Sequence, residues 1–89
     1  MNATKTRFIF KVDAAEKITV GSNIESGDTI ISEKCHSLTQ AKKLGEKLLK
    51  KKNVYSVWIH QFESDEQGDP LYQWTKYQDE LSWTGRSGW

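Results

Sequence analysis

The sequence predicts a two-layer α+β domain, in which one amphipathic helix packs on an antiparallel sheet of four to five strands. Three observations predict this class. A stripe of apolar residues at helical spacing occupies residues 38–49, and segments with alternating polarity lie on both sides of it. The chain has 89 residues, which is enough for one domain. The expected order of elements is β-β-(β)-α-β-β, where the third strand is short.

The amino-terminal part predicts a hairpin. Residues 7–12 alternate, with Phe8, Phe10 and Val12 on one face, which is a strand pattern. Residues 13–16 are interpreted as a short turn, and residues 17–20 as the second strand. Turn-rich segments follow at 21–23 and 25–28. Ile24 and residues 29–32 are expected to supply the short third strand.

The helix is the clearest element of the sequence. Its apolar face consists of Leu38, Ala41, Leu44, Gly45, Leu48 and Leu49. Ser37 and Gln40 fit a capping box at its start, with the Gln40 side chain reaching back to the cap. Asn53 is expected to take the left-handed cap position at its end. Gly45 costs about 1 kcal/mol relative to alanine inside a helix. We therefore expect a close approach to the sheet at this position.

Two further strands follow the helix. Residues 54–62 are a strong strand candidate, and residues 71–77 form the returning strand after a polar loop at 64–70. Tyr55, Val57 and Ile59 form the face best suited to the helix. Residues 1–80 are expected to make a single compact domain. Residues 81–89 show no periodicity and are interpreted as a carboxy-terminal tail or docked extension.

The net charge of +1 conceals a strong segregation of charge. Residues 34–52 carry seven lysines and one glutamate, whereas residues 53–80 carry one lysine and six acids. A dedicated non-specific nucleic-acid binder is usually far more basic than this chain. No apolar run reaches the length of a membrane span or a signal-peptide core, and the single Cys35 cannot form an internal disulfide. We therefore expect a cytoplasmic protein without membrane association.

No pattern in the sequence predicts catalysis, a cofactor or a metal. Cys35, His36 and His60 lack the spacing of metal ligands, and a structural thiol with surface imidazoles is the simpler interpretation. A thiolate at Cys35 would be favoured just before the helix, yet no orienting group or oxyanion loop accompanies it. The acids around the loop at 64–70 lack a calcium-binding pattern. No phosphate-binding glycine motif occurs.

Aromatic residues are the second unusual feature, because a sheet covered by one helix leaves its other face open. The face opposite the helix is expected to show Trp58 and Phe62. One of two alternating sets from the returning strand should join them: the Trp74 set (Tyr72, Trp74 and Lys76) or the Tyr77 set (Leu71, Gln73, Thr75 and Tyr77). The tail places Arg86 between two tryptophans, and these residue types dominate interface energetics. The predicted partner-binding residues are Trp58, Phe62, Trp74, Trp83, Arg86 and Trp89. The alternative is that the tail folds over this face, with Trp83 covering it.

The helix carries a stripe of lysines on the side away from its apolar face. Two interpretations stay open: a binding site for phosphates or for an acidic partner, and a solubilising surface. The residues concerned are Lys43, Lys47, Lys50 and Lys51.

These features support two main functional hypotheses. The first is a non-enzymatic binding or inhibitor module that engages a partner protein or a second copy of itself, typical of bacterial and phage accessory proteins. The second is RNA or single-stranded DNA binding, in which a lysine-rich helix contacts phosphates and an aromatic sheet stacks bases. No RNP-type segment occurs, and the element order differs from that of RNA-recognition domains. A small hydrolase or transferase built on Cys35 is the weakest hypothesis.

Overall fold

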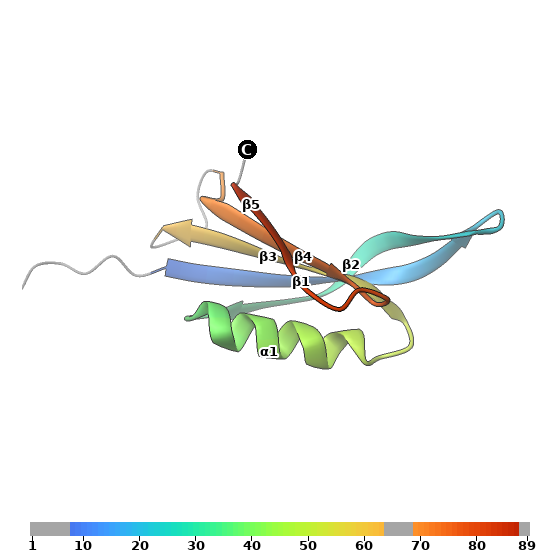
Figure 1. The fold of residues 1–89 in the computed structure, drawn as a ribbon, viewed down its shortest axis with the longest axis horizontal. Helices are drawn as coiled ribbons and strands as arrows, with labels where there is room; N and C mark the ends of the chain where they lie inside the picture. Colours follow the sequence, from blue (N-terminus) through green and yellow to red (C-terminus); the bar gives the residue numbers. More distant parts are fainter. Residues whose placement is uncertain (1–7, 64–68, 88–89) are drawn as a thin grey trace, which may run out of the picture.

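A computed structural model of the chain describes residues 8–63 and 69–87. Its elements are β1 (Phe8–Val20), β2 (Asn23–Cys35), α1 (Leu38–Leu49), β3 (Val54–Glu63), β4 (Tyr72–Tyr77) and β5 (Thr84–Ser87). The strands form one antiparallel sheet in the order β2-β1-β3-β4-β5, and α1 lies across one face of it (Figure 1). The predicted two-layer α+β class is therefore confirmed.

The amino-terminal hairpin differs from the prediction. Residues 13–16 are not a turn, because β1 continues through them and the chain reverses at Gly21, which has φ +64°. Register shifts at Ala14 and Ala15 mark an irregularity in the strand. Both alanines are buried, so the strand passes through the core where a turn was expected. The end of the β1–β2 hairpin projects beyond the helix (Figure 1).

The buried residues of the helix all belong to the apolar face that the sequence predicted. The Ser37 hydroxyl accepts a hydrogen bond from the Gln40 backbone N–H at 3.1 Å, as the capping box requires. The Gln40 side chain reaches back to the N–H of His36 rather than to that of Ser37. The carboxy-terminal cap is Lys50, so the helix ends earlier than an Asn53 cap implied. At Gly45, an added Cβ would lie 3.0 Å from Val57 on β3, which confirms the expected close approach.

The core lies between α1 and the two strands β1 and β3. Its fully buried members include Val12, Val57 and Ile59. Tyr55 instead forms an edge contact with Tyr77, with the ring centroids 5.4 Å apart. The buried Ser56 hydroxyl shares a 2.7 Å hydrogen bond with Ser26 of β2, which satisfies its polar group.

The segment from residue 81 onward contributes a strand. β5 pairs with β4, and its register places Gly85 opposite Trp74 and Arg86 opposite Gln73. The sequence showed no alternation here, because a four-residue edge strand exposes all its side chains and needs no apolar face. The stretch expected as a tail or docked extension therefore completes the sheet.

Candidate functional site

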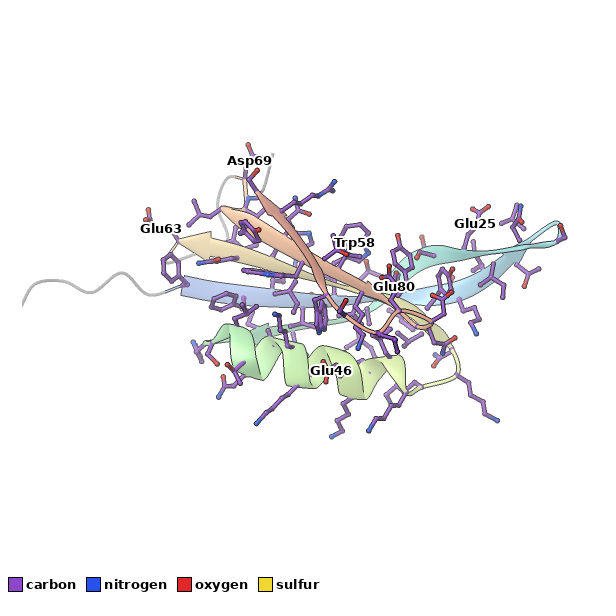
Figure 2. All side chains as sticks on the ribbon, in the orientation of Figure 1. Glu25, Glu46, Trp58, Glu63, Asp69 and Glu80 are labelled. Atoms are coloured by element: carbon purple, nitrogen blue, oxygen red, sulfur yellow. The ribbon has the colours of Figure 1, made fainter. Side chains whose placement is uncertain are left out.

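The sheet face opposite α1, here called the open face, follows from the strand register. Directly opposed residues in antiparallel strands point to the same side, so the side chains of Asp13, Trp58, Thr75 and Thr84 share one row. Trp58 lies on the side of the sheet away from the helix (Figure 2). Its ring stacks along β3 on His60, within 5° of parallel and with centroids 6.5 Å apart.

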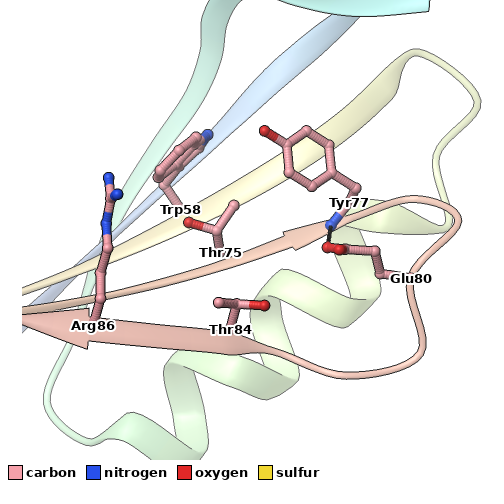
Figure 3. Close-up of a pocket in the computed structure, with 6 residues that line it drawn as sticks. All are labelled: Trp58, Thr75, Tyr77, Glu80, Thr84 and Arg86. Carbon is pink, nitrogen blue, oxygen red and sulfur yellow. Dashed lines mark hydrogen bonds between the residues drawn. The ribbon is translucent and has the colours of Figure 1, made fainter.

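A pocket of about 210 Å³ opens on this face. It is lined by Trp58, Thr75, Tyr77, Glu80, Thr84 and Arg86 (Figure 3). The Tyr77 backbone N–H donates to the Glu80 carboxylate at 2.9 Å, which fixes Glu80 at one end of the pocket. Arg86 is exposed, and no described residue forms an ion pair with it. The volume is below the range of typical cofactor sites and suits a single side chain.

A polar cluster crosses the sheet beside this pocket. The Ser32 hydroxyl donates to Asp13 Oδ1 at 2.6 Å, and Asp13 Oδ2 lies 3.6 Å from His60 Nδ1. Burial lowers the pKa of His60, and the nearby Lys11 lowers it further. The Asp13 carboxylate and a hydrogen bond with Gln73 act in the opposite direction and raise this pKa. The serine contacts the acid rather than the imidazole, so the cluster lacks the order of a nucleophile, base and orienting acid. The sequence did not predict this cluster, because residues 13–16 were interpreted as a turn and Asp13 was therefore not placed on the sheet.

The lowered pKa of His60 makes stability depend on pH in a defined direction. Because the unfolded chain binds a proton near pH 6.5 and the folded chain binds it only at lower pH, stability falls as the pH drops below about 6.5. His60→Gln should reduce this loss. The measurement is the melting temperature at several pH values between about 7.5 and 5, with the exposed His36→Gln as the control variant. Equal pH profiles for wild type and His60→Gln would contradict the prediction.

The predicted aromatic set is divided between the two faces. Trp58 and Arg86 meet at the pocket on the open face. Phe62 belongs to the open face by register but is only 9% exposed, so it offers little surface. Trp74 lies on the helix side, packed against the core and 6.1 Å from the ring of Phe10. Trp89 lies outside the described residues. The Tyr77 set, and not the Trp74 set, therefore belongs to the open face.

Trp83 lies on the helix side. The interpretation in which the tail folds over the open face, with Trp83 covering it, is therefore wrong. Its indole N–H donates to Glu46 Oε2 at 3.2 Å, and an added Cβ at Gly45 would lie 2.6 Å from Trp83 Cη2. The Lys76 ammonium lies 3.9 Å from the same Glu46 oxygen. Trp83 therefore anchors the connection between β4 and β5 to the helix.

The predicted lysine site lies on the opposite layer of the molecule. Its four members are exposed on α1 or directly after it: Lys43, Lys47, Lys50 and Lys51. Because α1 covers one face of the sheet (Figure 1) and Trp58 lies on the other face (Figure 2), the lysines of the helix and Trp58 lie on different layers. A single ligand that contacts both the lysines and Trp58 would therefore have to pass around an edge of the sheet.

The remaining candidates are Cys35 and the acids around the loop at 64–70. Burial, and secondarily the nearby Glu33, raise the pKa of the half-buried Cys35 thiol, which opposes the thiolate form that a position just before the helix would favour. Within residues 8–63 and 69–87, no group of three potential metal ligands comes together. Glu63 and Asp69 are exposed at the end of the acidic loop, while Asp65 and Glu66 lie outside the described residues.

No family model, no curated protein and no solved structure matches the chain. In the described part of the chain, no helix has the length and apolarity needed to cross a membrane.

Proposed function

We propose that this protein is a non-enzymatic binding module, and that it engages a partner protein through the open face of its sheet. The observation that carries the proposal is the pocket in which exposed Arg86 lies beside half-buried Trp58. Tryptophan and arginine contribute most often to the energetic centre of protein interfaces. The side-chain-sized volume favours an anchor residue of a partner over a free cofactor.

The local chemistry supports recognition rather than catalysis. Thr75 and Thr84 add hydroxyl groups to the pocket, and Glu80 adds an acceptor at its far end. A polypeptide carries the donors, acceptors and apolar groups that match such a mixed lining. RNA or single-stranded DNA binding stays as the alternative function, supported by the exposed lysines of α1. Those lysines lie on a different layer of the molecule from Trp58.

Quantitative affinity capture from the native cell tests the proposal. Wild-type bait should enrich one protein, and Trp58→Ala should reduce its recovery by about tenfold or more, because an interface loses its central anchor. The matched control is Lys43→Glu combined with Lys47→Glu, which alters the opposite layer and should leave recovery unchanged. The proposal fails if Trp58→Ala recovers as much partner as wild type. It also fails if nuclease treatment removes all bound material and the lysine variant abolishes binding.

A further inference from the structure

The pocket on the open face carries opposite charges at its two ends (Figure 3). Arg86 lies at one end and Glu80 at the other, and both side chains are exposed. The two do not form an ion pair with each other, and no other residue in the described part of the chain forms one with either of them. The pocket therefore presents a cation and a carboxylate that do not neutralise each other by direct contact.

The carboxylate end of the pocket is held in place before any ligand binds. The Tyr77 backbone N–H donates to Glu80 Oε1 at 2.9 Å, and the Glu80 backbone N–H donates to the Tyr77 carbonyl at 3.0 Å. The Tyr77 ring is itself supported by Tyr55, with the ring centroids 5.4 Å apart. Among the described residues, Glu80 Oε2 has no hydrogen-bond partner. A carboxylate that is already ordered loses less conformational entropy when a ligand binds.

The same end of the pocket offers the aromatic surface that a cation prefers. His60 lies along one face of the Trp58 indole, because the two rings are within 5° of parallel. Since His60 follows Trp58 by two residues on β3, the other face of the indole is turned back toward Ser56. Ser56 is opposite Tyr77 in the register. A lysine ammonium or an arginine guanidinium is attracted to the face of such a ring. With Glu80 beside it, this end therefore suits a basic side chain.

The spacing of the two ends matches an extended polypeptide. Arg86 is opposite Gln73 of β4 in the register, and Tyr77 follows Gln73 by four residues. A strand rises about 3.3 Å per residue, so the two ends are about 13 Å apart along the strands. Residues i and i+4 of an extended ligand have the same separation and point to the same side. One ligand strand can therefore place an acid at Arg86 and a basic residue at Glu80.

We propose that the pocket binds an extended segment of the partner protein in which a lysine or arginine lies four residues from an acid. The basic side chain enters between Trp58 and Tyr77 toward Glu80, and the acid pairs with Arg86. This inference rests on the proposed function and names the chemistry of the partner's anchor. A nucleic acid fits the arrangement less well, because its backbone charges are all negative and Glu80 repels them.

Binding of matched peptides to the full chain, followed by the NMR signal of the Trp58 indole N–H, tests the inference. The probe is the capped peptide Thr-Glu-Thr-Ala-Thr-Lys-Thr, whose β-branched residues favour an extended chain. One comparison peptide carries norleucine in place of lysine, and another carries glutamine in place of glutamate. Wild type should bind the parent peptide about threefold or more tightly than either, because each comparison peptide loses one charge interaction.

Two variants assign each preference to one end of the pocket. Glu80→Gln should abolish the preference for lysine over norleucine and keep the preference for glutamate over glutamine, and Arg86→Gln should do the reverse. Both positions are exposed, and the glutamine amide oxygen can still accept the Tyr77 hydrogen bond, so the fold should be retained. Circular dichroism checks this. The control is Glu25→Gln, an exposed acid on the projecting hairpin, which should leave both preferences unchanged.

Several outcomes would overturn the inference. These are equal binding of all three peptides by wild type, no binding of the parent peptide, a retained lysine preference in Glu80→Gln, or tighter binding of an oligouridine of seven nucleotides. Affinity capture separates this inference from the proposed function. If Trp58→Ala loses the captured partner while Glu80→Gln and Arg86→Gln keep it, the proposed function stands and this inference falls. If Trp58→Ala recovers as much partner as wild type, the proposed function fails whatever the peptides show.

Discussion

Replacing Trp83 with alanine is expected to lower the free energy of unfolding by about 3 kcal/mol, because truncating a large packed aromatic leaves a cavity. Trp83 packs against the core, and its indole donates to Glu46 across the helix. Since it also anchors the approach to β5, the loss should loosen the edge of the sheet. Chemical denaturation monitored by circular dichroism measures the effect. A loss below about 1 kcal/mol would show that the contact with the helix contributes little.

Two further variants separate this contact from other causes. Leu81→Ala lies in the same connection, where Leu81 is 98% exposed, and it should change stability by less than about 0.5 kcal/mol. Gly45→Ala should destabilise wild type, because its Cβ would press on Trp83 and Val57. In the Trp83→Ala background the contact with Trp83 disappears, while the contact with Val57 and the helix propensity of alanine act equally in both backgrounds. The cost of Gly45→Ala should therefore shrink by about 1 kcal/mol or more between the two backgrounds.

Replacing Ile59 with alanine is expected to cost about 3 to 4 kcal/mol of unfolding free energy. Ile59 is 0% exposed on the central strand, between Val12 of β1 and Trp74 of β4. Domains of this size have total stabilities of about 5 to 15 kcal/mol, so the loss is a large share. Thermal and denaturant unfolding measure it.

The same substitution on the projecting hairpin provides the control. Ile24 is 49% exposed, and Ile24→Ala should cost less than about 1 kcal/mol. Equal losses at the two positions would contradict the assignment of Ile59 to the core and of Ile24 to the surface.

The sequence pattern predicted those elements that pack one face against the core, because such packing makes apolar residues recur at a regular spacing. The helix at 38–49 and the strand from Val54 each have one face against the core, so their apolar residues repeat at the expected spacing. The reversal of the first hairpin was predicted too early. Asp13 to Glu16 resemble a turn in composition, but their side chains are arranged by contacts with β2 and β3, which lie far away in sequence.

The candidate site was predicted only in part. Trp58 and Arg86 were named from residue type, and the structure brings them together because β4 lies between β3 and β5. Trp74 and Trp83 were named on the same grounds but pack on the helix side.

The α+β class, the helix with its apolar face, and the segregation of charge into adjacent blocks all follow from the sequence alone. Periodicity and composition are local properties, so they can be read along the chain. The tertiary contacts settle which tryptophans face the core and turn the segment after residue 81 into an edge strand. These features depend on strand register and on the side that the helix covers, and both are set by contacts between residues distant in sequence.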